Sequence, residues 1–226
     1  MLQSSTVLFL KQLAKNNNKP WFDANRKKYD EARSDFENFI QSLIDQFGKK
    51  DASIAPLTAK NCMFRINRDI RFSKDKTPYK KNFAASMNQG GKKSILAGYY
   101  FHLEPGNSFV GGGIWMPMPA ETQKIRQEID YNFEEFKGIV MSKKFKQVFK
   151  ALDEEDEIKL TNVPKGYAKD NPAAEFLKLK SWVAMKPVKD AELTSKDLVK
   201  VSVEACATIQ PLLQFINRAV GDEAYT

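Results

Sequence analysis

The middle of the chain decides the fold: residues 95–115 read ILAGYYFHLEPGNSFVGGGIW. Ile95–Leu103, with its run of aromatic residues, is typical of a β-strand, and Phe109–Trp115 is typical of a second one. The tetrapeptide PGNS at 105–108 separates them and predicts a turn, because these residue types favour turn geometry. So short a connection makes the two strands antiparallel neighbours.

Further strands are predicted on both sides of this pair. Asn82–Asn88 and Ser181–Val188 read as strands, and Gly90-Gly91 is a hairpin signal. Met63–Phe72 alternates between apolar and polar residues, which indicates a strand with Phe64, Ile66, Ile70 and Phe72 on its apolar side. A helix here would instead gather Arg65, Arg68 and Arg71 on one side; the aromatic and isoleucine content favours the strand.

Helices are predicted before and after the strands. Ser4 or Ser5 can cap a short helix that stops near Asn16, and a second helix follows Pro20 and ends at Gly48. The second helix has the clearest pattern, an apolar stripe at helical spacing. Its members are Phe36, Phe39, Ile40, Leu43, Ile44 and Phe47. Pro119 opens helical sequence that extends through Phe149, and Ser195 starts a final helix.

Helices, then strands, then helices predict an α+β fold with an antiparallel sheet, and no change of composition divides it, so one domain over 1–226 is expected. Asp153–Glu157 reads as an acidic turn, and Leu160–Asn171 reads as a loop. A hydrophobic content of 42% excludes a disordered chain, and no apolar run is long enough to span a bilayer. Two distant cysteines and a first segment unlike a signal peptide predict a cytoplasmic protein without a membrane partner.

Positive charge is confined to one part of the chain. The formal net charge is +8, and residues 60–93 carry all of this excess, with ten basic residues and two acidic ones. Three of the chain's seven arginines, Arg65, Arg68 and Arg71, fall within this segment. Lysine is the usual basic residue elsewhere. A local concentration of arginine therefore predicts anion recognition, because a guanidinium offers a planar fork of donors that fits phosphate or carboxylate oxygens.

This basic segment holds the predicted site. The residues expected to bind the anion are Arg65, Arg68, Arg71, Lys76 and Lys80. Asp69, Asp75 and Tyr79 are the candidate catalytic groups, and either aspartate could orient a water or a magnesium ion. The competing interpretation is structural: the aspartates pair with neighbouring arginines, and Thr77-Pro78-Tyr79-Lys80 is an ordinary turn.

The same stretch resembles a known family. Its motif, R-x-x-R-D-x-R-F-x-x-D-K-x-x-Y over residues 65–79, is similar to the signature of a family of bacterial and fungal proteins of this length whose function is unknown. Similarity extends to Trp21-Phe22, to Gly111-Gly112-Gly113 and to Pro164-Lys165-Gly166-Tyr167. The resemblance implies which residues to examine, but no activity and no cofactor.

Other motifs have two interpretations each. His102, the only histidine, shares a strand face with Glu104 and is either a general base or a structural residue. Trp21, Asn25 and Tyr29 share a helix face that either stacks on a ligand or packs internally. The three glycines at 111–113 either admit a ligand to the backbone or allow close packing of strands. The usual nucleotide fingerprints and multi-histidine metal sites are absent from the sequence, so no metal ligands are predicted.

Three functions remain in competition. The first is a protein that binds a phosphate-bearing small ligand such as a nucleotide, with hydrolase or transferase activity left open. The second is a nucleic-acid-binding module that uses the basic segment and its aromatic residues. The third is an interaction protein whose basic segment docks an acidic partner. Convergence of the basic motif on a concave surface favours the first, and splay over an open surface favours the others.

Overall fold

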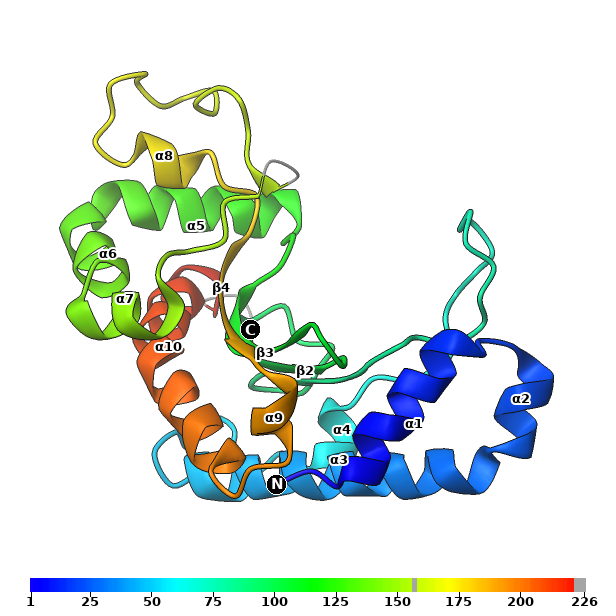
Figure 1. Cartoon of the computed structure of the whole chain (residues 1–226). Coiled ribbons are helices and arrows are strands. Elements are labelled where there is room, and N and C mark those ends of the chain that lie inside the picture. The colour runs from blue at the N-terminus through cyan, green and yellow to red at the C-terminus, as the bar shows by residue number, and fades with distance from the viewer. Residues whose placement is uncertain (156–157, 222–226) are drawn as a thin grey trace. The chain divides into compact units, whose positions relative to one another are not determined.

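The computed structural model describes residues 1–155 and 158–221 and has an antiparallel sheet in the middle of the chain. The strand order is β1-β2-β3-β4, with β1 (Phe83–Met87), β2 (Gly98–Leu103), β3 (Ser108–Ile114) and β4 (Trp182–Val188) (Figure 1). Helices precede and follow these strands, so the predicted α+β fold is confirmed. Asp156 and Glu157, which end the predicted acidic turn, lie outside the described residues.

The chain divides into two compact units, and each is described by itself. The first unit comprises Met1–Lys92, Tyr100–Val110 and Pro187–Glu204, and the second comprises Lys93–Tyr99, Gly111–Lys186 and Ala205–Thr226. The single domain over 1–226 that the sequence suggests stays a prediction. Among the described residues, no helix is long and apolar enough to cross a membrane.

The first unit begins with three helices, α1 (Ser4–Lys15), α2 (Lys19–Ala24) and α3 (Arg26–Phe47). The predicted serine cap of α1 is wrong, because Gln3 is the N-cap residue and the serines already lie in the first turn. A contact between helices replaces the cap: the carboxylate of Asp35 accepts hydrogen bonds from the Gln3 amide at 2.9 Å and from the Thr6 hydroxyl at 2.6 Å. The helix predicted after Pro20 is divided in two at Asn25.

Aromatic side chains of α3 form the core of the first unit. The predicted apolar stripe is confirmed, because all six of its residues are buried. Phe39 meets Phe101 of β2 edge-on at 4.7 Å between ring centroids, and Phe36 stacks on Phe83 of β1 at 5.6 Å. α1 packs beside α3 and adds Phe9 to the same cluster (Figure 1). Burial of these rings ties the helices to one face of β1 and β2.

The second half of the chain is helical where the sequence predicts it, with short breaks between the helices. The stretch from Pro119 to Phe149 is three helices, α5 (Pro119–Tyr131), α6 (Phe133–Val140) and α7 (Lys143–Phe149). The final helix, α10 (Leu198–Val220), begins at Leu198 instead of Ser195. The remaining helices are short: α4 (Ala59–Cys62), α8 (Ala174–Leu177) and α9 (Asp190–Leu193). Both cysteines, Cys62 and Cys206, are buried and form no disulfide with each other.

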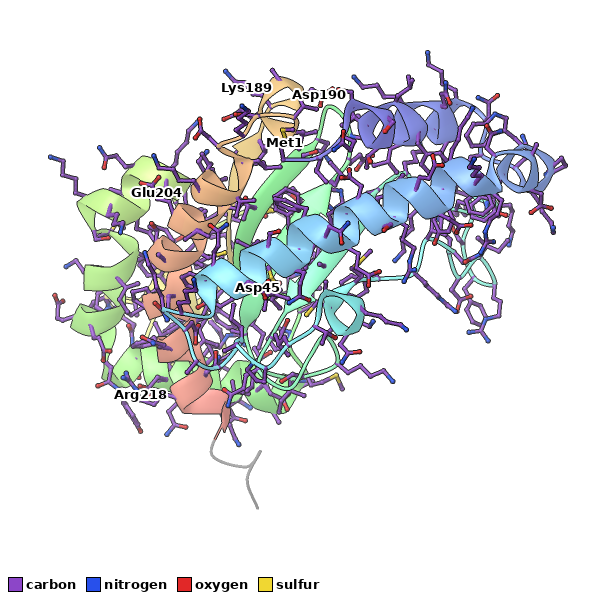
Figure 2. The ribbon with its side chains drawn as sticks, turned by 90° about the horizontal axis from the view of Figure 1, so that it is seen from below. Met1, Asp45, Lys189, Asp190, Glu204 and Arg218 are labelled. Atoms are coloured by element: carbon purple, nitrogen blue, oxygen red, sulfur yellow. The ribbon has the colours of Figure 1, made fainter. Side chains whose placement is uncertain are left out.

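Aromatic packing and ion pairs hold the second unit together. Phe136 of α6 packs against Phe215 of α10 at 5.3 Å and edge-on against Phe176 of α8 at 5.1 Å. Arg218, near the C-terminal end of α10 (Figure 2), donates to the carboxylates of Glu128 and Glu135. The last turn of α10 is thereby connected to α5 and α6.

Two glycines let β3 approach β4 more closely than any other residue type would. A Cβ atom on Gly111 would lie 2.0 Å from the carbonyl oxygen of Ala184, and one on Gly113 would lie 2.0 Å from that of Trp182. Gly113 also has a φ of +129°, which strains side-chain-bearing residues. Of the two interpretations of this glycine run, the structure supports close packing of strands.

Gly111→Ala is expected to lower the free energy of unfolding by about 2–3 kcal/mol, because the new methyl group overlaps the Ala184 carbonyl and the strands must separate. Urea denaturation measures the change. Gly138→Ala is the matched control: no heavy atom lies within 4 Å of its Cβ position, and it sits inside α6. That variant is expected to be more stable by about 0.5–1 kcal/mol. Equal stability of the two variants would contradict the packing argument.

Candidate functional site

The predicted arginine motif lies on a projecting hairpin of the first unit, residues 64–82, which we name the basic arm. Its two sides pair antiparallel through backbone hydrogen bonds from Arg68 to Pro78 at 2.9 Å and from Lys80 to Ile66 at 2.8 Å. Between them, residues 69–77 form the tip, which extends away from the helices of its unit (Figure 1). The strand predicted over Met63–Phe72 is wrong: Met63 and Asn67 form isolated bridges to Ala85 and Tyr79, and the residues after Arg68 form a loop.

The base of the basic arm is anchored by Asn17, which stands between α1 and α2. The side chain of Asn17 makes two hydrogen bonds to the backbone of Tyr79. It donates to the carbonyl at 2.8 Å and accepts from the N–H at 3.1 Å. The buried Tyr79 ring stacks on Phe22 at 4.0 Å between centroids. The structure thus places this predicted catalytic residue within an aromatic cluster, and its catalytic role stays a prediction.

Arg68 closes the tip of the basic arm. Its guanidinium donates to the Asp75 carboxylate at 2.5 Å, to the Thr77 carbonyl at 3.1 Å and to the Thr77 hydroxyl. It also reaches the Ser73 hydroxyl at 3.3 Å. The amide and hydroxyl of Thr77, followed by Arg68, lower the pKa of Asp75 to about 2. These contacts join the two ends of the tip. They give Arg68 and Asp75 a structural role within the motif.

The other motif residues point to several different partners. Arg71 forms a bidentate pair with Asp69, at 2.7 and 2.9 Å, which lowers the pKa of that carboxyl. The Lys76 ammonium donates to the carbonyl of Ile70 at 3.0 Å. Lys80 lies over the Phe64 ring, and burial together with nearby Arg65 lowers its pKa. The motif therefore does not converge on one anion, and its part in ligand binding stays a prediction.

Asp75 is expected to titrate near pH 2, which NMR of its side-chain carboxyl can measure. Its pKa is lower in the folded protein than the ordinary value of 3.8, so its contribution to tip closure is complete above about pH 4 and is lost as the pH falls through about 2. Arg68→Ala should raise this pKa, because it removes a charged donor. Arg71→Ala is the control and should raise the pKa of Asp69 only. An unchanged pKa of Asp75 in Arg68→Ala would contradict the closure of the tip by the Arg68–Asp75 pair.

A concave site lies in the second unit, on one side of α5. This cavity, of about 940 Å³, is lined by a polar face of the helix, by the segment before it and by residues 160–167. We name it the α5 cavity. Thr122, Arg126 and Asp130 line it at helical spacing, whereas Ile125 and Ile129, on the neighbouring face of the helix, are buried in the core. The helix thus presents charged and polar side chains to the cavity.

Arg126 is the unusual residue of the α5 cavity. Its Nη2 donates to the Leu179 carbonyl at 3.0 Å, while its Nε is buried without a hydrogen-bond partner. Burial lowers its pKa, although nearby Tyr167 opposes this shift. Among the described residues, Arg126 and Arg65 are the only arginines that form no ion pair with a carboxylate. A half-buried guanidinium without a paired carboxylate has donors that can bind an anion.

The neighbours of Arg126 carry both charge and aromatic surface. Lys165 and Lys180 add positive charge, and Asp130 is the only acidic residue of the lining. Asp130 accepts a hydrogen bond from Asn171 at 2.5 Å. Burial, followed by the charge of Asp130, raises the pKa of Tyr167, so its phenol remains a hydrogen-bond donor at neutral pH. The arrangement can hold an anion and stack a flat group.

The sequence contained two signals of this site. Lys165, Gly166 and Tyr167 belong to the PKGY stretch that carries the family resemblance, and the structure places all three in the cavity lining. Arg126 is one of the chain's seven arginines and lies outside the arginine-rich motif. Its spacing to Thr122 and Asp130 indicates a polar helix face, which is less evident than the apolar spacing of Ile125 and Ile129.

The other sequence candidates have internal partners. His102 Nε2 lies 3.1 Å from the Glu104 carboxylate, and its ring stacks on Phe109 at 4.8 Å between centroids. Trp21 stacks on Phe9, and Tyr29 packs against Phe22. These contacts favour the structural interpretation of both motifs. Within the described ranges, no three histidine, cysteine, aspartate or glutamate side chains are grouped to hold a metal ion.

Fold and site together define an α+β protein with an arginine-centred cavity and a projecting basic arm. Residues 5–215 match the model of DUF2461, described as a conserved hypothetical protein, and the chain belongs to that family. This match confirms the resemblance to a family of uncharacterised proteins. The signature over residues 65–79 stays a prediction. No curated protein and no solved structure matches the chain.

Proposed function

We propose that the protein binds a phosphate-bearing small organic ligand in the α5 cavity, with Arg126 as the residue that holds the phosphate. One observation carries the proposal: the guanidinium of Arg126 is half-buried, has an unpartnered Nε and lacks a carboxylate partner among the described residues. A cation that is partly withdrawn from water without a paired counter-charge lowers the stability of the fold. A bound anion would supply the missing partner and offset this cost.

The chemistry of the cavity favours a phosphate as the anion. A guanidinium fits phosphate oxygens with two parallel hydrogen bonds, and its charge does not depend on pH in the physiological range. Lys165 and Lys180 line the same cavity, so basic residues outnumber the single acid, Asp130. The protonated phenol of Tyr167 is a further donor. A group with several acceptor oxygens and more than one negative charge uses these donors best.

The remaining lining favours an organic ligand over inorganic phosphate. About 940 Å³ is within the usual range of small-molecule sites and is much larger than a phosphate ion needs. Apolar and aromatic side chains contribute to the wall. They are Met116, Pro117, Pro119, Tyr131, Leu160, Pro164 and Tyr167. A nucleotide or a sugar phosphate has both the charged end and the flat or apolar body that this lining suits.

Nucleotides and sugar phosphates are expected to raise the melting temperature of the wild-type protein in a thermal-shift screen, because ligand binding stabilises the folded state by mass action. Arg126→Gln should weaken the binding of the best ligand by about 10- to 100-fold, since it removes charge-assisted hydrogen bonds. Calorimetric titration gives the dissociation constants. The melting temperature of the unliganded variant verifies that it folds.

Two further variants locate the site. Arg33→Ala removes an arginine from the exposed surface of α3, where it pairs with Glu37, and should bind as tightly as the wild type. Arg71→Ala tests the alternative that the motif of the basic arm is the small-ligand site. If affinity falls in Arg71→Ala and not in Arg126→Gln, the ligand sits on the basic arm and the proposal for the α5 cavity is refuted.

Hydrolase or transferase activity on this ligand stays a prediction from the sequence. Incubation of the protein with each ligand that binds, followed by phosphate release or product chromatography, tests it with and without magnesium. Turnover that is lost in Asp69→Asn or Asp75→Asn but kept in Asp130→Asn would support the predicted catalytic residues of the basic arm. Turnover that is lost in Asp130→Asn but kept in Asp69→Asn and Asp75→Asn would indicate a reaction within the α5 cavity.

A further inference from the structure

The tip of the basic arm exposes a phenylalanine almost completely. Phe72 is 95% exposed, although the alternating pattern of Met63–Phe72 predicts an inward position for it. That prediction is wrong because strand pairing ends at Arg68, so nothing directs later residues toward the core. The Arg71 guanidinium lies 5.8 Å from the ring centroid and is the one contact given for the ring among the described residues. An exposed aromatic ring at the end of a projecting hairpin is suited to contact a partner.

Five cations of the basic arm have no acidic partner among the described residues. Asp69 pairs with Arg71 and Asp75 pairs with Arg68, so these four charges cancel within the arm. The cations left without an ion pair are Arg65, Lys74, Lys76, Lys80 and Lys81. They extend from the base of the arm to its tip. A line of uncompensated cations is complementary to a linear polyanion.

The basic arm is held in shape before any partner arrives. Arg68 closes the tip through Asp75 and Thr77, and Asn17 anchors the base through the backbone of Tyr79. Binding therefore does not have to order this hairpin, which reduces the entropy cost of association.

We propose that the basic arm is a DNA-binding arm that enters a groove of a DNA duplex. The five uncompensated cations contact phosphates on the groove walls, and Phe72 stacks on or between base pairs as an apolar wedge, as exposed apolar side chains of DNA-bending proteins do. This function is separate from ligand binding in the α5 cavity and uses none of its residues. A membrane surface is less suited to the arm, because only one large apolar side chain, Phe72, is fully exposed at the tip.

The charge part of the proposal is tested by fluorescence anisotropy with a labelled 20-base-pair duplex and the full chain. If all five cations contact phosphates, affinity should fall about 500-fold between 50 and 200 mM salt. The double variant Lys74→Ala/Lys76→Ala should reduce the slope of log affinity against log salt by about 2. Lys143→Ala/Lys144→Ala is the matched control, since it removes two exposed lysines of α7 in the second unit and should leave the slope unchanged.

The wedge is tested by Phe72→Ala, which should weaken duplex binding about 5- to 150-fold and leave the salt slope unchanged, because it removes stacking and no charge. A duplex containing 2-aminopurine should brighten with wild-type protein and remain dim with this variant. Trp115→Ala removes another exposed aromatic side chain and should behave like the wild type. Phe72 has almost no buried surface, so its loss should not alter the melting temperature.

Three outcomes would overturn the proposal. The first is a duplex affinity that depends neither on Phe72 nor on the lysine pair of the tip. The second is tighter binding to a single strand of the same length, which would indicate base stacking without a groove. The third is Phe72-dependent binding to vesicles of anionic phospholipid with no binding to the duplex, which would make the partner a membrane surface.

Discussion

The close pairing of β3 with β4 is the constraint on which the second unit depends. Gly111 and Gly113 remove the side chains that would meet the backbone of the neighbouring strand. The segment leaving β3 begins α5, and the segment entering β4 contains Leu179 and Lys180. The ends of both strands therefore contribute to the α5 cavity, with Met116 and Pro117 after β3 and Lys180 before β4. A hydrogen bond from the Met116 amide to the Ser181 hydroxyl, 2.9 Å long, connects these ends directly.

The fold could be predicted wherever the residues that form an element also carry its pattern. The stripe from Phe36 to Phe47 predicts a buried helix face, and in the structure all of it is buried, with Phe36 and Phe39 on rings of β1 and β2. β2 behaves likewise, with Phe101 and Leu103 buried on one side of the strand. The division of the helix after Pro20 at Asn25 was missed, because a change of direction leaves the apolar spacing on either side intact.

The candidate site could be predicted only in part, because its contacts join distant parts of the chain. Arg126 depends on the Leu179 carbonyl and on Tyr167, and neither is a neighbour in sequence. The arginine-rich motif is conspicuous because its members are close together in sequence, and this same closeness lets Arg68 and Arg71 pair with local aspartates. Density of charge along a chain thus identifies a basic surface, while a buried cation without a partner is found only from the folded structure.

The closing contacts of the basic arm have a consequence for how its shape depends on the rest of the unit. All groups that the Arg68 guanidinium binds lie within residues 73–77, and the anchor of the base involves the backbone of Tyr79 and its ring. The tip is thus closed by residues that are close together in sequence, and the rest of the unit holds Tyr79 through Asn17 and Phe22. Substitutions elsewhere in the core that leave these two residues in place should therefore leave the shape of the tip unchanged.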